Sequence, residues 1–279
     1  MLRKFVKMEG AGNDYIYFDC LREPLASPEN LAVRLSDRHR GIGGDGIVLI
    51  CPSGRADAKM RMFNADGSEG KMCGNAIRCV GKYLFESGAV PKSEMEIETL
   101  SGIKRLWLFP EGGTVRRVRV DMGKAEFAAA KIPVNLPAAQ IIDYPLRLAG
   151  MQRRITCVSM GNPHCVVFED PDGIELDAVG PLFENASVFP QRVNTEFVQK
   201  TGERSLKMRV WERGSGETLA CGTGACAVAV AAVENGFCTR GADIDVRLPG
   251  GTLVVRYQED GKVWLTGDAN TDFTGTIEI

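Results

Sequence analysis

Two short stretches of the chain place a cysteine before a glycine at the start of a segment with helical character. "CGTGAC" begins at Cys221 and leads into the apolar run "AVAVAAV", and "CGNAIRC" begins at Cys73 and leads into apolar residues at helical spacing. The first N–H groups of a helix lack intrahelical partners, and the helix dipole is positive there, which favours a thiolate. Each cysteine is therefore a candidate for proton transfer, with a small core residue packed at a helix start as the alternative.

An internal repeat relates these two stretches. Shifting the sequence by 148 positions lays residues 60–88 on residues 208–236 with eight identities in 29 positions, where average composition gives about two by chance. Cys73 falls on Cys221 in this alignment, and "AGNDY" falls on "MGNPH" after a change of register by one residue. The chain is therefore predicted to be two copies of one α/β unit, which favours a functional pair of thiols over two unrelated core residues.

Two thiols on opposite sides of a substrate suit one reaction in particular. A thiolate on one face of an α-carbon removes its proton, and a thiol on the other face returns a proton with inversion. Helix N–H groups stabilise the negative charge that builds on the carboxylate meanwhile. This is racemisation or epimerisation of an amino acid, and we expect no cofactor for it. The second cysteines, Cys79 and Cys226, do not align and are expected to be ordinary helix residues.

Alternating strand patterns dominate both halves, and few segments have helical periodicity. The clearest helices are residues 28–38, residues 75–86 and the apolar segment after Cys221, which is predicted to be a buried central helix. The Pro/Ala-rich residues 128–139 are predicted to cross between two domains.

Composition limits the class of protein. The chain has 279 residues, 44% of them hydrophobic and 25% charged, with a net charge of -2, which predicts a globular protein without an electrostatic footprint for nucleic acid. The N-terminus lacks the apolar stretch of a signal peptide, and no apolar run approaches the ~18 residues of a membrane span. Nine cysteines without a CxxC spacing, and only two histidines, indicate reduced thiols in a cytoplasm and no metal site.

Six motifs in series resemble the diaminopimelate epimerase family. They span residues 8 to about 226 and read "GAGNDY", "RHRGIGGDG", "MRMFNADGSEGKMCGN", "MGNPHC", "VNTEFV" and "ERGSGETLACGTGAC". The resemblance implies an α/β (α+β) fold of two pseudo-symmetric halves, each a curved, mostly antiparallel sheet wrapped around a central helix, with the active site in the cleft between them. The expected halves are residues 1–122 with 268–279 and residues 123–267, the C-terminal "TGTIEI" returning to the first. A cytoplasmic homodimer is also expected.

The resemblance also assigns the site. It implies cofactor-independent epimerisation of LL-2,6-diaminopimelate to the meso form, a step of lysine and cell-wall precursor biosynthesis, with Cys73 and Cys221 as the acid/base pair. The carboxylate of the reacting centre would be held by the backbone of Gly74, Asn75, Gly222 and Thr223. The other substrate contacts would be Asn13, Asn64, Asn162, Asn194, Glu212 and Arg213, with His164 beside the reacting centre. Arg213 suits the distal carboxylate because its guanidinium can bind in bidentate fashion. Some family members have a glutamine contact where this chain has Gly46, so no side-chain contact is expected there.

Three other interpretations of the sequence remain, and a fourth, a dinucleotide-binding site, is rejected. "GIGGDG" matches a dinucleotide fingerprint, but a strand-like "IVLIC" follows it where a helix should begin, and we reject it. A proline or hydroxyproline racemase also uses two cysteines, but its substrate needs no contacts to a distal head. A Cys–His acyl transferase or amidase would use Cys165 or Cys221 with His164 as base, and it leaves the second repeated cysteine unexplained. The non-enzyme alternative is a small-molecule binding module in which the thiols are structural.

Overall fold

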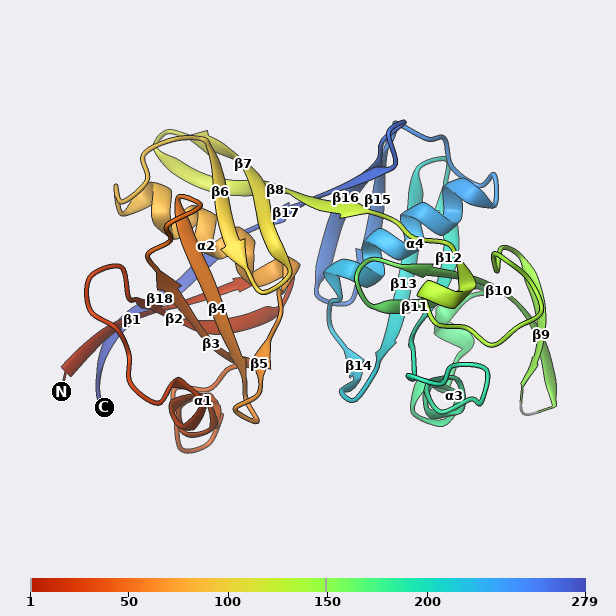
Figure 1. The fold of residues 1–279 in the computed structure, drawn as a ribbon, viewed down its shortest axis with the longest axis horizontal. Helices are drawn as coiled ribbons and strands as arrows, with labels where there is room; N and C mark the ends of the chain where they lie inside the picture. Colours follow the sequence, from red (N-terminus) through yellow and green to blue (C-terminus); the bar gives the residue numbers. More distant parts are fainter. Residues whose placement is uncertain (1, 149) are drawn as a thin grey trace. The chain divides into compact units, whose positions relative to one another are not determined.

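The computed structural model describes residues 2–148 and 150–279, and the chain divides into two compact units (Figure 1). The first unit comprises the chain up to Asp121 together with Thr266–Ile279, and the second is Met122–Leu265. The chain leaves the first unit within strand β8 (Thr114–Lys124) and returns to it within β17 (Lys262–Asp268). Long strands with alternating burial carry both crossings.

The first unit is a mixed sheet with two helices. Neighbouring strands pair in the order β18-β1-β2-β3-β4-β6-β7-β8, with β5 on β4; the β2–β3 and β4–β6 pairs are parallel and the others are antiparallel. The C-terminal strand pairs with β1 from Leu2↔Glu278, so the expected return of the C-terminus to the first half is confirmed. The remaining elements are β1 (Leu2–Gly10), β2 (Asn13–Asp19), α1 (Pro28–Ser36), β3 (Gly46–Cys51), β4 (Ala58–Asn64), β5 (Glu69–Gly70), α2 (Gly74–Glu86), β6 (Glu94–Thr99), β7 (Gly102–Glu111) and β18 (Asn270–Glu278).

The second unit repeats this topology. Its strands pair in the order β9-β10-β11-β12-β13-β15-β16, with β14 on β13, and again two pairs, β11–β12 and β13–β15, are parallel. Its elements are η1 (Ala129–Lys131), β9 (Tyr144–Leu148), β10 (Met151–Ser159), β11 (Pro163–Phe168), η2 (Pro171–Gly173), α3 (Leu176–Glu184), β12 (Asn194–Gly202), β13 (Ser205–Glu212), β14 (Gly216–Thr218), α4 (Gly222–Glu234), β15 (Asp243–Leu248) and β16 (Gly251–Tyr257).

The hydrogen-bond register confirms the duplication that the sequence predicts. Ile47 pairs with Phe63 in the first unit, and Thr195 pairs with Trp211, 148 positions later, in the second. The β2–β3 and β11–β12 pairs correspond after a change of register by one residue, because Tyr15 pairs with Gly46 and His164 with Asn194, shifts of 149 and 148 positions. The repeat is therefore one of pairing pattern as well as of residue type, and corresponding side chains point to the same face in each sheet.

A central helix forms the core of each unit. In Figure 1, α2 and α4 each lie within the curve of their strands; α2 packs against β1, β2 and β7, and α4 against the strands from β10 to β13 and against β15 and β16. The eight residues from Ala225 to Ala232 of α4 are fully buried. Strands surround α4, so its small apolar side chains are buried on every side of the helix.

Two segments differ from the sequence-based expectation. The prediction that residues 128–139 cross between domains is wrong: they lie inside the second unit, where Ala129, Ile132 and Val134 join its hydrophobic core. Helix α3 was not predicted, because Pro181 lies within it and interrupts the helical signal.

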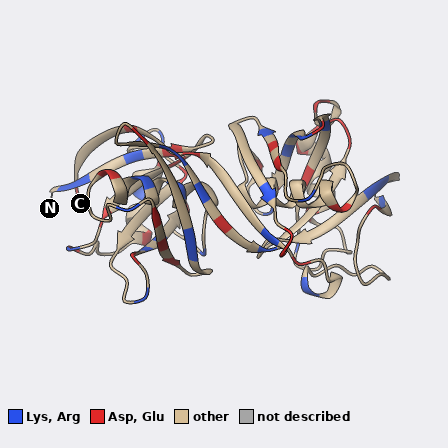
Figure 2. Ribbon diagram, turned by 90° about the horizontal axis from the view of Figure 1, so that it is seen from above, with Lys and Arg blue, Asp and Glu red and all other residues tan. Residues whose placement is uncertain are grey.

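Charges of both signs alternate along the ribbon. Figure 2 shows Lys and Arg interspersed with Asp and Glu on the strands of both units, in keeping with the small net charge. Within the described part of the chain, no helix combines the length and the apolar character needed to cross a membrane.

A fully buried arginine fastens the start of α2 to the returning chain. The Arg78 side chain is 0% exposed; its Nε donates to the Asp268 carbonyl at 3.0 Å, and its Nη1 donates to the Gly74 carbonyl at 3.0 Å and to Asn75 Oδ1 at 2.9 Å. Gly10 makes room for the guanidinium, because a Cβ there would lie 2.9 Å from Nη2. Arg78 therefore couples the helix start to the C-terminal segment.

We expect Arg78→Ala to lower the free energy of unfolding by about 2–4 kcal/mol, because it leaves a cavity and orphans buried acceptors. Arg55→Ala is the control: Arg55 is exposed and pairs with Glu98 at 2.9 Å, so its loss should cost less than about 1 kcal/mol. Denaturant unfolding of both variants measures the difference, and equal midpoints would contradict the structural role of Arg78.

Candidate functional site

Cys73 occupies the N-cap position of α2. Its backbone is extended, with φ -128° and ψ 123°, and its Sγ accepts the Ala76 N–H at 3.5 Å. The Cys73 thiol in turn donates to Asn13 Oδ1 at 3.2 Å. The sulfur thus satisfies one of the amides that a helix start leaves unpaired, and the half-buried thiol lies where the helix dipole is positive.

A carboxylate supports the asparagine beside Cys73. Asn13 Nδ2 donates to Asp45 Oδ2 at 2.5 Å, and Arg38 pairs with Asp45 at 3.0 Å. Arg38 also pairs with Asp14 at 2.6 Å. Burial raises the pKa of Asp14, but hydrogen bonds from Arg38 and Lys7 outweigh it, so that the pKa lies below its usual value. Sequence reasoning missed Asp45, although it belongs to "GIGGDG"; the strand register that brings it to Asn13 is not readable from one chain.

The other predicted residues of the first unit lie nearby in the fold. Asn64 ends β4, and its Nδ2 donates to Ser68 Oγ at 3.0 Å. Asn75 is buried and its side-chain oxygen accepts from Arg78, and its backbone lies with that of Gly74 in the first turn of α2. At Gly46 a Cβ would lie 2.0 Å from the Phe63 carbonyl, which explains the absence of a side chain at this position.

Cys221 occupies the corresponding N-cap of α4. Its φ of -123° and ψ of 111° match Cys73, its Sγ accepts the Gly224 N–H at 3.4 Å, and Thr223 Oγ1 lies 3.5 Å away. Burial raises the pKa of the Cys221 thiol well above its usual value; the carboxylates of Glu212 and Glu196 raise it further, and the hydrogen bond from Thr223 opposes them. Cys221 is therefore a thiol in the structure as it stands.

His164 belongs to a buried chain of hydrogen bonds that ends at Cys221. Its Nδ1 lies 2.6 Å from Glu196 Oε1 and its Nε2 lies 3.1 Å from Asn162 Oδ1. Asn162 Nδ2 donates to Thr223 Oγ1 at 3.2 Å. His164 and Glu196 are both 0% exposed, and burial raises the pKa of Glu196 although the imidazole lowers it. The histidine therefore orients Asn162 and, through it, Thr223.

Sequence reasoning also missed Glu196. The signal was present: Asn194 and Glu196 are two residues apart in β12 and so share one face of the strand. Gly224 allows the Glu196 carboxylate to approach the first turn of α4, because a Cβ at residue 224 would lie 2.8 Å from Glu196 Oε1.

The remaining predicted residues of the second unit are Asn194, which begins β12, Glu212, which ends β13, and Arg213, which follows it. Asn194 Oδ1 accepts the Arg213 N–H at 2.9 Å and its Nδ2 donates to the Pro163 carbonyl at 2.9 Å. Thr218 Oγ1 donates to Glu212 Oε1 at 2.5 Å, and Arg213 Nη1 donates to the Gln191 carbonyl at 2.9 Å. Both ends of the Asn194 amide are thus used within the protein, where they fix the backbone of Arg213.

The predicted residues gather into two half-sites with corresponding members. Under the 148-residue shift Asn64 lies on Glu212 and Gly74-Asn75 lies on Gly222-Thr223; Asn13 lies on Asn162 after the change of register. Each half-site offers a thiol, the first amides of a 13-residue helix and neutral or anionic oxygen atoms. Such a set can bind an amino acid's carboxylate at the helix start and its ammonium group at the oxygens.

The geometry disfavours the Cys–His nucleophile. Both ring nitrogens of His164 face oxygen atoms of Glu196 and Asn162. Cys165 is fully buried, and burial raises the pKa of its thiol well above the usual value. Neither cysteine is therefore activated by the imidazole as a base.

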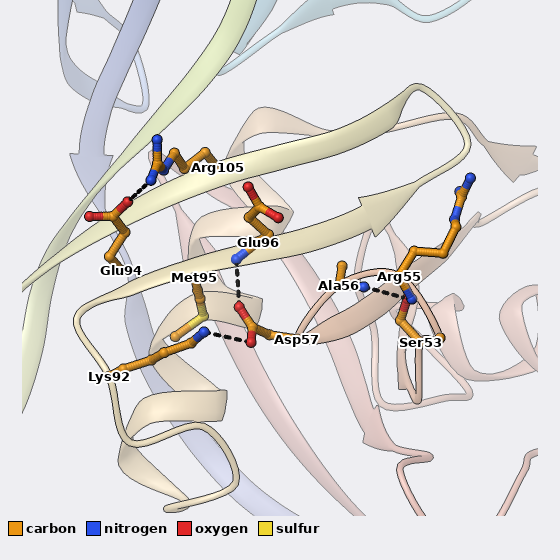
Figure 3. A pocket seen from close by; sticks show the side chains of 10 residues that line it. Ser53, Arg55, Ala56, Asp57, Lys92, Glu94, Met95, Glu96 and Arg105 are labelled. Atoms are coloured by element: carbon orange, nitrogen blue, oxygen red, sulfur yellow. Dashed lines mark hydrogen bonds and ion pairs between the residues drawn. The ribbon is translucent and has the colours of Figure 1, made fainter.

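A separate hollow in the first unit contains none of these residues. It has a volume of about 520 Å³ and is lined by the segment 53–57 before β4, by Lys92, by β6 and by Arg105 of β7, with many charged side chains (Figure 3). Lys92 pairs with Asp57 at 2.7 Å, and Arg105 pairs with Glu94. Its cations and carboxylates neutralise one another. Within residues 2–148 and 150–279, no cluster of three or more His, Cys, Asp or Glu side chains is arranged to hold a metal.

Known proteins match the chain along nearly its full length. The family model for diaminopimelate epimerase matches residues 5–128 and 156–271. A diaminopimelate epimerase from Acetivibrio thermocellus is 50% identical over 278 residues, which cover 99% of each chain. One from Methanococcus maripaludis strain S2 is also 50% identical over 278 residues, covering 99% of this chain and 100% of the other.

Solved structures with the same fold are much more distant in sequence. A PhzF-family phenazine biosynthesis protein from Bacillus anthracis superposes with a TM-score of 0.70 at 16% identity, over 100% of both chains. A probable proline racemase from Agrobacterium radiobacter gives a TM-score of 0.70 at 16% identity, over 99% of this chain and 93% of the other. These confirm the expected two-repeat α+β fold. By its family match and its relatives, the chain belongs to the diaminopimelate epimerase family.

Proposed function

We propose that this chain epimerises LL-2,6-diaminopimelate to the meso form without a cofactor, with Cys73 and Cys221 as the acid/base pair. The observation that carries this proposal is the pair of N-cap thiols at corresponding positions of the two repeats. The family membership supports the substrate, and with it a role in lysine and cell-wall precursor biosynthesis.

In this mechanism the helix starts bind and the thiols transfer protons. The amides of Gly74 and Asn75, and of Gly222 and Thr223, receive the carboxylate of the reacting centre and the negative charge that grows on it during deprotonation. One Sγ, as thiolate, takes the α-proton; the other Sγ–H gives its proton to the opposite face, which inverts the centre. The chemistry requires both sulfur atoms to reach one α-carbon.

The carboxylates around Cys221 suit a cationic substrate. Glu212 and Glu196 raise the pKa of the Cys221 thiol. A substrate ammonium group placed against Glu212, which already accepts from Thr218, offsets that negative charge and makes the thiolate less costly. Binding of the substrate would thus prepare Cys221 for proton transfer.

The remaining polar residues select the substrate. Arg213 is proposed to bind the distal carboxylate, with Asn194 fixing its backbone, and Asn13, Asn64 and Asn162 to contact substrate amines. His164 would act through Asn162. A proline-type substrate has no distal head and would leave Arg213 without a partner. From the family resemblance we also propose that the protein is a cytoplasmic homodimer. Within each chain, the proposed epimerase halves are residues 1–122 with 268–279, and residues 123–267.

Cys73→Ala and Cys221→Ala should each reduce epimerisation by at least about 10²–10⁴-fold, because each removes a proton-transfer group. The measurement is the interconversion of LL- and meso-diaminopimelate, resolved by chiral separation, with solvent deuterium at the inverted α-carbon and no cofactor added. Cys226→Ala, one turn into α4 and fully buried, is the control and should retain turnover. Normal turnover by either N-cap variant would end the two-thiol mechanism.

Arg213→Met should raise the KM for diaminopimelate by roughly 10–100-fold, since a charge-assisted hydrogen bond contributes about 1.5–3 kcal/mol. The unfolding midpoint should change little, because the Arg213 guanidinium lies near the surface and donates to one backbone carbonyl. A panel of proline, hydroxyproline and glutamate, assayed alongside, tests the selectivity. Unchanged affinity for diaminopimelate would exclude Arg213 from the substrate site.

Glu212→Gln should shift the pH profile to lower pH. Glu212 raises the pKa of Cys221, so the neutral amide lowers that pKa, and the thiolate forms at lower pH in the direction that uses Cys221 as base. The amide can still accept from Thr218. The profile of kcat/KM against pH checks this, and a shift to higher pH would show that Glu212 does not act on Cys221 electrostatically.

A further inference from the structure

The Asn13 amide is held between a carboxylate and a thiol. Asp45 pairs with Arg38 at 3.0 Å, and its Oδ2 lies 2.5 Å from Asn13 Nδ2. An ionised carboxylate can only accept hydrogen bonds, so the end of the amide that faces it must be the NH₂ group. The oxygen of the same amide therefore faces Cys73, and it accepts the thiol proton over 3.2 Å.

The position of Asp45 is itself fixed by its neighbours. Its backbone N–H donates to the Asp14 carbonyl at 2.7 Å, and its own carbonyl accepts from Ala65 at 3.0 Å. Its Oδ2 accepts the Asp14 N–H at 3.1 Å as well as the Asn13 amide. This aspartate belongs to "GIGGDG", the motif rejected as a nucleotide site. Held from both sides, the carboxylate imposes one orientation on Asn13.

The other half of the molecule uses its asparagine in the opposite sense. Asn162 turns its oxygen to His164 and its NH₂ group to Thr223. A threonine hydroxyl, which can donate or accept, therefore lies beside Cys221. A carbonyl oxygen, which can only accept, lies beside Cys73. The two thiols therefore have different hydrogen-bond partners, although the folds of the two units correspond.

We propose that Asp45 is a positioning residue that fixes the Asn13 amide and thereby holds Cys73 in its protonated form. In the direction in which Cys221 is the base, Cys73 then enters the reaction as the proton donor, because ionising it places a thiolate against a carbonyl oxygen. The catalytic meaning rests on the proposed function, whereas the effect on the thiol does not.

Other titratable groups near Cys73 come from three elements. Tyr17 lies on β2, Arg78 and Cys79 lie on α2, and the Glu9 carbonyl on β1 accepts from Cys79. Burial raises the pKa of Tyr17 well above its usual value and that of Cys79 to about 12, so both are neutral near pH 7. All of these groups are unchanged in the variants below.

The test follows alkylation of Cys73 by iodoacetamide as a function of pH, without substrate, by mass spectrometry of the peptide. Asp45→Asn can donate as well as accept, which frees Asn13 to turn its NH₂ group to Cys73. We expect the midpoint of the alkylation rate to fall by about half to one pH unit, which makes alkylation near neutral pH roughly 3–10-fold faster. Asp45→Ser, which also lacks the carboxylate, should give a fall in the same direction.

The matched control is Asp57→Asn. Asp57 also accepts a backbone N–H, from Glu96 at 2.8 Å, and pairs with Lys92, but it lies at the hollow drawn in Figure 3. The Cys73 midpoint should not move in this variant. An equal shift there would show that loss of any carboxylate in the unit has the same effect, and would overturn the assignment.

A second comparison separates positioning from a direct charge effect. Asn13→Ala removes the acceptor and should lower the midpoint, and adding Asp45→Asn should then change it no further. An unchanged or raised midpoint in Asp45→Asn, or an additional shift in the double variant, would overturn the proposal. A lowered midpoint in a protein that does not epimerise diaminopimelate would refute only the proposed function.

Discussion

The unpaired amides at the first turn of a helix are the constraint on which the rest of this structure depends. A sulfur atom caps that turn in both units, Cys73 for the Ala76 N–H and Cys221 for the Gly224 N–H. A cap residue has an extended backbone and a side chain turned back over the helix start. The same geometry that satisfies the amide therefore leaves the thiol beside the neighbouring amides, where a carboxylate binds. Capping of the helix and placement of the thiol therefore depend on the same backbone and side-chain geometry.

Duplication provides this cap twice, but the surroundings of the two thiols have diverged. Cys221 is buried near two carboxylates, and a chain of hydrogen bonds runs from a histidine through an asparagine to the threonine beside the thiol. Cys73 is half-buried and meets an asparagine directly. Since the order and direction of the paired strands correspond in both units, the side chains beside each thiol account for much of this difference. A two-base reaction uses one ionised and one protonated thiol, and unequal surroundings influence which of the two carries the proton.

The sequence contained much of this architecture, because the repeat and the alternation of strand residues are local patterns. The two central helices and the thiols at their starts could be predicted from the residues themselves, whereas the return of the C-terminus was implied only by the family resemblance. The residues that hold the site residues in place could not be predicted, because strand register and packing bring their partners near. Asp45 contacts Asn13 and Glu196 contacts His164, each over a separation of 32 residues. Arg78 contacts Asp268 over a separation of 190 residues. Pro181 hid a helix for the opposite reason, because tertiary packing overrode a local signal.

The charge balance of the second unit explains why an enzyme of this design would tolerate an unfavourable thiol. Burial and the carboxylates of Glu212 and Glu196 keep Cys221 protonated, which protects it from oxidation because the thiolate is the reactive form. A diamino substrate brings the positive charge that this arrangement lacks. In the proposed mechanism, activation of the Cys221 thiol then accompanies binding of the ligand, so that reactivity and substrate selection depend on the same carboxylates.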